Sequence, residues 1–136
     1  MKSLPNKPSA LILLALKDLR ETERLKKYVV DMGIWHEPID EGKCLVCLAG
    51  SVMCRTLKAS PDRHLDPEDF GSKNSVKLRA LDHLRSGQIS QALDSLGLDP
   101  PDLIQSEIDI TPYEDDPDDF KADMKQLALN LKKLGF

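Results

Sequence analysis

The segment 116–136 constrains the fold most, because it carries every signal of one amphipathic helix that needs a partner. Asp116 stands where an N-cap is expected, Pro117 fits the first helical position and Gly135 follows the last turn. Apolar residues then recur at spacings of four and three, at Phe120, Met124, Leu127, Leu131 and Leu134. Two heptads are too few for a free-standing coiled coil. This seam is therefore predicted to pack on a helix of the same chain, with a homodimer contact as the alternative.

Further helices are predicted from the same 3.6-residue periodicity. The first covers residues 8–27, where Pro8 is tolerated in the opening turn and the apolar and charged residues fall on opposite arcs. Others are predicted over residues 44–58, 76–85 and 88–97. The 44–58 helix is apolar nearly all round, which is typical of an interior helix.

Two short segments have the composition of strands. Tyr28–Met32 is rich in β-branched residues, and Glu107–Thr111 alternates isoleucine with polar residues. At 136 residues, the chain has the length of one ordinary domain. The predicted fold is therefore mainly α, a compact bundle of about five helices in a single domain, residues 1–136, to which these segments could add a two-stranded β ribbon.

Composition places the chain among folded proteins outside the membrane. Hydrophobic residues make up 40% and charged residues 31%, which argues against wholesale disorder. The longest apolar run, Ala10 to Leu16, is too short for a bilayer that needs roughly 20 residues. Three cysteines without framework spacing fit a reducing cytoplasm better than secretion.

Charge is distributed unevenly along the chain. Residues 1–58 carry ten Lys and Arg against seven acids, whereas residues 99–136 carry four against ten. Direct binding to a nucleic-acid backbone is therefore not expected. The acidic stretch that includes Asp115, Asp116, Asp118 and Asp119 leaves open one alternative, a mimic of DNA that inhibits a DNA-binding protein. Helix capping already accounts for three of these acids.

All three cysteines lie in one apolar stretch, and their predicted role is packing. On a helix, Cys44, Cys47 and Cys54 share one face, and small thiols are among the most buried side chains. The sequence Ala49-Gly50-Ser51 should let a neighbouring backbone come close. No metal, cofactor or catalytic residue is predicted.

Two chemical alternatives use the same residues. Cys44 and Cys47 have the spacing of two zinc ligands, with His36 as a third, but Cys54 lies about 10 Å further along a helix and could not join them. A redox Cys-x-x-Cys would sit at a helix start after a strand, and only the helix start is predicted. Neither His64 nor His83 supplies a paired ligand, and no motif of nucleotide binding, serine hydrolysis or metalloproteolysis is present.

The loop between residues 33 and 43 holds the best candidate for a binding surface. Trp35 is the only tryptophan, and tryptophan is enriched at binding hot spots. His36 beside it is titratable near neutral pH. The predicted partner-binding residues are Trp35, His36, Glu37 and Asp40.

Three stretches, YVVDMGIWH, CLVCLAGSVM and LRALDHLRSGQISQAL, resemble a family of small accessory proteins encoded by tailed bacteriophages and prophages. The resemblance covers roughly residues 28–93. It implies a non-enzymatic protein in the cytoplasm of a bacterial host, where proteins of this type bind a host or phage protein and inhibit or redirect it. No catalytic residue is carried over, because the family has no known activity. A monomer or a homodimer is expected.

Overall fold

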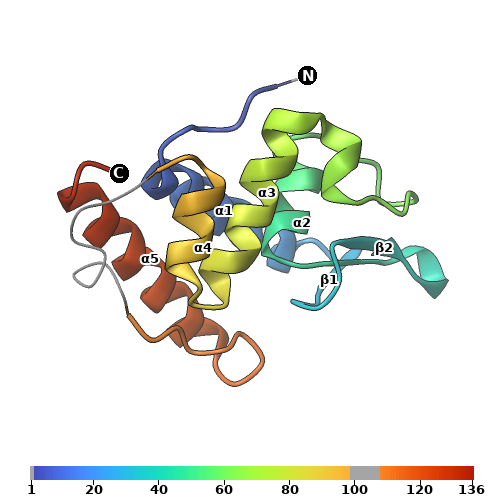
Figure 1. The fold of residues 1–136 in the computed structure, drawn as a ribbon. Coiled ribbons are helices and arrows are strands. Elements are labelled where there is room, and N and C mark those ends of the chain that lie inside the picture. Colours follow the sequence, from blue (N-terminus) through green and yellow to red (C-terminus); the bar gives the residue numbers. More distant parts are fainter. Residues whose placement is uncertain (1, 99–107) are drawn as a thin grey trace.

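The computed structural model describes residues 2–98 and 108–136. Its α-helices are α1 (Pro8–Arg24), α2 (Leu48–Arg55), α3 (Ser72–Arg85), α4 (Ile89–Ser95) and α5 (Pro117–Lys133). Its strands are β1 (Tyr28–Val30), β2 (His36–Pro38) and β3 (Cys44–Val46), and two 3-10 turns cover Asp40–Gly42 and Pro67–Phe70. The prediction of a mainly α bundle of about five helices is confirmed for this part of the chain. Figure 1 shows the helices grouped together, with the strands beyond α2 on the side away from α5.

Helix α1 is the central element of the bundle. It packs against α5, α2, α3 and β1. The predicted seam of α5 is buried at Phe120, Met124, Leu127 and Leu131. The seam therefore finds its partner helix within the chain, as the sequence indicates. The main cluster of buried apolar side chains draws on all five helices.

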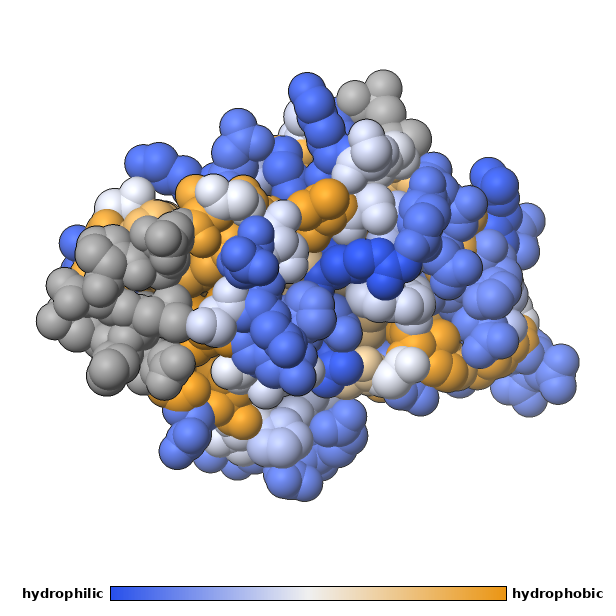
Figure 2. Space-filling view, in the orientation of Figure 1, coloured by the Kyte–Doolittle hydropathy of each residue, from blue (hydrophilic) through white to orange (hydrophobic). Residues whose placement is uncertain are grey.

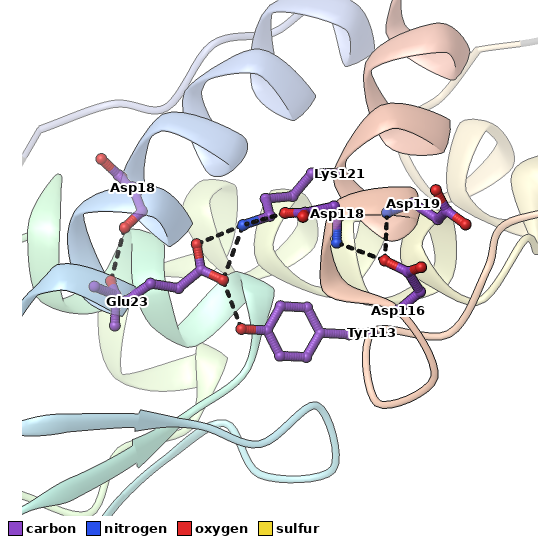
Figure 3. A network of polar contacts seen from close by, with 8 residues as sticks. Asp18, Glu23, Tyr113, Asp116, Asp118, Asp119 and Lys121 are labelled. Atoms are coloured by element: carbon purple, nitrogen blue, oxygen red, sulfur yellow. Dashed lines mark hydrogen bonds and ion pairs between the residues drawn. The ribbon is translucent and has the colours of Figure 1, made fainter.

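Hydrogen bonds and an ion pair join the end of α1 to the start of α5 (Figure 3). The Tyr113 hydroxyl donates to Glu23 Oε2 at 2.6 Å, and Lys121 Nζ donates to Glu23 Oε1 at 2.7 Å. Asp116 caps α5, because its Oδ1 accepts the backbone N–H groups of Asp118 and Asp119 at 3.1 Å each. The helix therefore starts where the sequence predicts.

The three strands form one small sheet in the order β1-β3-β2. The central strand, β3, pairs parallel with β1 and antiparallel with β2, so that His36 faces Val46 and Tyr28 faces Cys44 across the ladders. Figure 2 shows hydrophobic side chains at the surface over the strand region, and larger hydrophobic areas on the α4 and α5 side of the same face. Val29 of the edge strand is 40% exposed.

The helix predicted over residues 44–58 is wrong at its start. Cys44–Val46 is strand β3, and α2 begins only at Leu48 after Cys47, whose backbone is extended. Cys44 and Val46 are buried and Leu45 is partly exposed, which is the alternation of a strand. A short apolar run fits either periodicity, so pairing with β1 and β2 decided the outcome.

The predicted two-stranded ribbon is also corrected. Residues 28–30 do form a strand, but their partner is β3, and residues 108–111 are irregular. Glu107 lies outside the described residues. Three helix boundaries differ by at least three residues as well, because α1 ends at Arg24 rather than residue 27, α2 ends at Arg55 rather than residue 58 and α3 begins at Ser72 rather than residue 76.

Candidate functional site

Trp35 lies just before β2, on a tight turn that follows β1. The turn is closed by Asp31, whose side chain accepts the Gly33 N–H at 2.9 Å and whose carbonyl accepts the Ile34 N–H at 3.1 Å. The Trp35 side chain is half-buried against the main core. The guanidinium of Arg79 on α3 lies over its ring, 5.9 Å from the ring centroid. Part of the Trp35 residue therefore stays accessible beside a cation.

The backbone of Trp35 is fixed by a close approach to α2. A Cβ built on Gly50 would meet the Trp35 carbonyl oxygen at 1.8 Å, which no real side chain could do. This confirms the prediction that Ala49-Gly50-Ser51 admits a neighbouring backbone. The Cys47 thiol also points at this carbonyl, with Sγ 4.0 Å from the oxygen. The position of Trp35 is therefore set by backbone packing as well as by its ring.

A notch of about 110 Å³ opens beside Trp35. It lies between the 32–35 turn and α3, and the ion pair of Arg85 with Asp82, 2.8 Å long, forms one wall. Its volume suits a single side chain of a bound partner. We refer to six residues around it as the Trp35 surface: Gly33, Ile34, Trp35, Arg79, Asp82 and Arg85.

The two arginines of the Trp35 surface are held by weak ion pairs. Arg79 pairs with Glu68, and Arg85 pairs with Asp82. All four side chains are at least a quarter exposed to solvent, and such pairs contribute about 0–1 kcal/mol. A carboxylate from a binding partner could therefore replace Glu68 or Asp82 at little cost.

His36 does not belong to this surface, and its prediction as a contact residue is corrected. It is 0% exposed, because β2 turns its side chain inward. Its Nδ1 lies 2.7 Å from the Arg63 carbonyl oxygen, which can only accept, so Nδ1 carries the proton and donates. The backbone N–H of Leu65 donates to the His36 carbonyl at 3.0 Å. His36 therefore anchors the 60–65 loop to the sheet.

Burial keeps His36 and Cys44 uncharged. The Cys44 Sγ lies 3.7 Å from His36 Nδ1 and 3.8 Å from Nε2, and Nε2 is free to accept a hydrogen bond from the thiol. Desolvation lowers the pKa of His36 and raises the pKa of Cys44 to about 11. Two neutral groups result, rather than the thiolate and imidazolium pair of a cysteine nucleophile.

We expect the buried His36 to make the protein less stable in mild acid. Because its pKa is lowered on folding, the unfolded chain binds the proton more readily, so the free energy of unfolding falls as pH drops below about 6.5. One such group contributes a slope of at most about 1.4 kcal/mol per pH unit. Urea unfolding between pH 7.5 and 5.0 measures this slope.

His36→Gln should flatten that pH dependence, because glutamine can still donate to the Arg63 carbonyl but does not titrate. His83→Gln is the matched control. His83 is partly exposed on α3, so this variant should keep the wild-type slope. Equal slopes in wild type and His36→Gln would contradict the assignment.

Cys44 and Cys47 do not converge, although the sequence spaces them like a ligand pair. Cys44 belongs to a small buried cluster with Tyr28, Val46 and Cys54, whereas Cys47 belongs to the main core. Cys47 instead caps α2, since its Sγ accepts the Gly50 N–H at 3.3 Å. In the part of the chain that the structure describes, no three His, Cys, Asp or Glu side chains are grouped to hold a metal.

The predicted packing role of the thiols agrees with their environment. Cys44, Cys47 and Cys54 are 0%, 2% and 5% exposed. A helix N-terminus ordinarily lowers a thiol pKa, but burial outweighs that effect and raises the pKa of Cys47 to about 11. Burial raises the pKa of Cys54 as well. None of the three thiols is placed to react with a solute.

The other predicted site residues lie elsewhere. Glu37 is half-buried on β2, and Asp40 is exposed in the 3-10 turn between β2 and β3. Neither lines the notch beside Trp35. Four acids of the α5 start, Asp115, Asp116, Asp118 and Asp119, are exposed. They occupy one helical turn and the residues before it, a much shorter array than the phosphates of a DNA duplex.

Sequence reasoning missed the contribution of α3 to this surface. Arg79, Asp82 and Arg85 lie far from Trp35 in the chain, and no local pattern connects them to it. The only available signal was the general enrichment of arginine beside tryptophan at binding sites.

Comparison with family models, with curated proteins and with solved structures gave no match. Among the described residues, no helix is both long enough and apolar enough to span a bilayer.

Proposed function

We propose that this protein is a non-catalytic accessory protein of a phage or prophage that binds a host or phage protein in the bacterial cytoplasm through the Trp35 surface. The observation that carries the proposal is a fixed tryptophan, stacked under Arg79 and beside a notch of side-chain size. Tryptophan and arginine are the residues most enriched at binding hot spots. The phage origin rests on the resemblance of residues 28–93 alone.

The same surface indicates what the partner should offer. An apolar side chain would fill the notch beside the indole, and an adjacent carboxylate would pair with Arg79 or Arg85 in place of Glu68 or Asp82. The Trp35 backbone is already immobilised by Gly50, so little ordering entropy is lost there on binding. A non-catalytic role is supported by the burial of all three thiols and of His36.

The test is affinity capture from bacterial lysate, followed by binding of the purified partner measured by calorimetry. Trp35→Ala should weaken that binding at least about tenfold, as expected for a hot spot. Arg79→Glu should do so as well, and it leaves the core untouched because Arg79 is exposed. Leu129→Ala on α5, where the side chain is 41% exposed, is the control and should bind normally.

Wild-type affinity in both Trp35→Ala and Arg79→Glu would exclude this surface. The DNA-mimic alternative makes a different prediction, because its binding should be lost when Asp115, Asp116, Asp118 and Asp119 are all replaced by asparagine. It is the weaker candidate, since Asp116 is already used as a helix cap.

A further inference from the structure

A second and larger pocket, of about 320 Å³, lies between α1, the end of α2 and the N-terminal segment. It shares no residue with the Trp35 surface. Four basic and two acidic side chains line it: Lys2, Lys17, Arg55, Lys58, Asp18 and Glu21. The net charge that this pocket presents to a ligand depends on which of these six side chains are already paired within the protein.

The two acids are engaged within the protein. Glu21 accepts from Arg55, with Oε2 3.0 Å from Nε. Asp18 is only 3% exposed, its Oδ2 accepts the Thr56 hydroxyl at 2.5 Å, and burial raises the pKa of its carboxyl group. Three exposed ammonium groups remain. They belong to Lys2, Lys17 and Lys58. Within residues 2–98 and 108–136, none of the three has a carboxylate oxygen within 4.0 Å of its nitrogen.

The backbone that carries Lys2 is held in place by two buried polar side chains of α3. Asn74, 5% exposed, accepts the Leu4 N–H at 3.1 Å and donates to the Lys2 carbonyl at 2.9 Å. The ammonium of Lys77, 8% exposed, donates to the Leu4 carbonyl at 2.6 Å. Burying such groups is costly unless each is hydrogen-bonded, so residues 2–4 have a defined path across the bundle.

The backbone at Lys58, another residue that lines the pocket, is fixed as well. Its φ is 61°, a left-handed conformation that residues other than glycine rarely adopt. The flanking backbone imposes it, since Leu57 N–H donates to the Val52 carbonyl at 3.0 Å and Ala59 N–H donates to the Met53 carbonyl at 2.9 Å. Glycine or asparagine would adopt this conformation with less strain than lysine does.

We propose that this pocket binds a small organic phosphate, with Lys2, Lys17 and Lys58 contacting the phosphate oxygens. Three ammonium groups of separate segments suit a multiply charged, multi-oxygen anion. The volume lies at the lower end of the range for small-molecule sites, about 300–1,000 Å³. The Thr56 hydroxyl oxygen at the pocket wall donates to Asp18 and can still accept from a hydroxyl or amino group, so a phosphate carried on a hydroxylated group such as a nucleoside fits better than the bare anion.

Calorimetric titration of the full chain at low ionic strength tests this site, with inorganic phosphate, pyrophosphate and ADP as probes. ADP should bind saturably with a Kd below about 1 mM and more tightly than pyrophosphate, which in turn should exceed phosphate. Lys17→Gln and Lys2→Gln should each weaken ADP binding up to about fivefold, the usual limit for one exposed ion pair. Lys58→Asn should do the same, because asparagine keeps the left-handed turn while removing the charge.

Lys125→Gln, on the exposed face of α5, is the control and should leave ADP binding unchanged. Equal weakening by Lys125→Gln would mean that only net charge matters and would overturn the site. So would the absence of saturable ADP binding, or wild-type affinity in the three pocket variants. Pyrophosphate binding as tight as that of ADP would overturn the contact with Thr56. None of these variants alters the Trp35 surface, so the outcome is independent of the capture experiment.

Discussion

Replacing Gly50 by alanine is expected to lower the free energy of unfolding by about 3 kcal/mol, a large effect for one added methyl group. The new Cβ would lie 1.8 Å from the Trp35 carbonyl oxygen and 3.1 Å from its carbon. This carbonyl cannot retreat easily, because the next residue, His36, is paired with Val46 in the sheet. Either α2 or the 31–36 segment must move.

Two measurements distinguish a local displacement of the Trp35 turn from a loss of stability of the whole protein. Urea unfolding followed by circular dichroism gives the free energy, and fluorescence of Trp35, the single tryptophan, reports the turn itself. Gly33→Ala is the matched control. Its Cβ would meet only Asp31 Oδ1, at an ordinary 3.4 Å, and the change should stay within about 0.5 kcal/mol. Equal stabilities of the two variants would refute the close contact.

Replacing Phe120 by alanine should lower the free energy of unfolding by about 3–5 kcal/mol, the usual range for a buried phenylalanine. The side chain is 1% exposed in the main core and also packs edge-on against Tyr113, with ring centroids 5.7 Å apart. Its removal leaves a cavity and loosens the 108–116 segment at the same time.

Leu129→Ala is the control for this experiment, because it lies on the same helix with 41% of its side chain exposed. It should change the unfolding free energy by less than about 0.5 kcal/mol. Urea midpoints of the two variants, at unchanged slope, give the comparison. A loss below 1 kcal/mol for Phe120→Ala would mean that α5 is not docked as described.

Helix α5 could be predicted almost to the residue because its signals are local. Asp116, Pro117 and Gly135 mark its ends, and the apolar spacing fits only one periodicity. Helix α1 was predicted nearly as well for the same reason. The start and stop signals of such helices lie in the local sequence and do not depend on what the helices pack against.

Of the sheet, only the strand at residues 28–30 could be predicted, because each of the three strands is only three residues long. Residues 44–46 fit a helix or a strand equally well, and the choice depends on pairing with β1 and β2. His36 was misplaced for the same reason. Its burial follows from the inward face of β2, and a short stretch ending in Pro38 gives little sign of being a strand.

The candidate sites also combine residues that local sequence identifies with residues that only the folded structure brings together. Trp35 and the small residues around Gly50 could be identified from the sequence, since their residue types already limit what they do. The arginines of α3 and the lysines around Asp18 could not, because their grouping exists only after α1, α2 and α3 have packed together.

The packing of α1 against α5 has a consequence for how the protein is made. The two helices are separated by about 90 residues, so at roughly 5–20 residues per second α1 waits on the order of 5 to 20 s on the ribosome before α5 is synthesised. During that interval its leucine-rich side can be covered only in part, by α2 and α3. Nascent chains should therefore be most exposed to chaperones and proteases until α5 emerges from the exit tunnel.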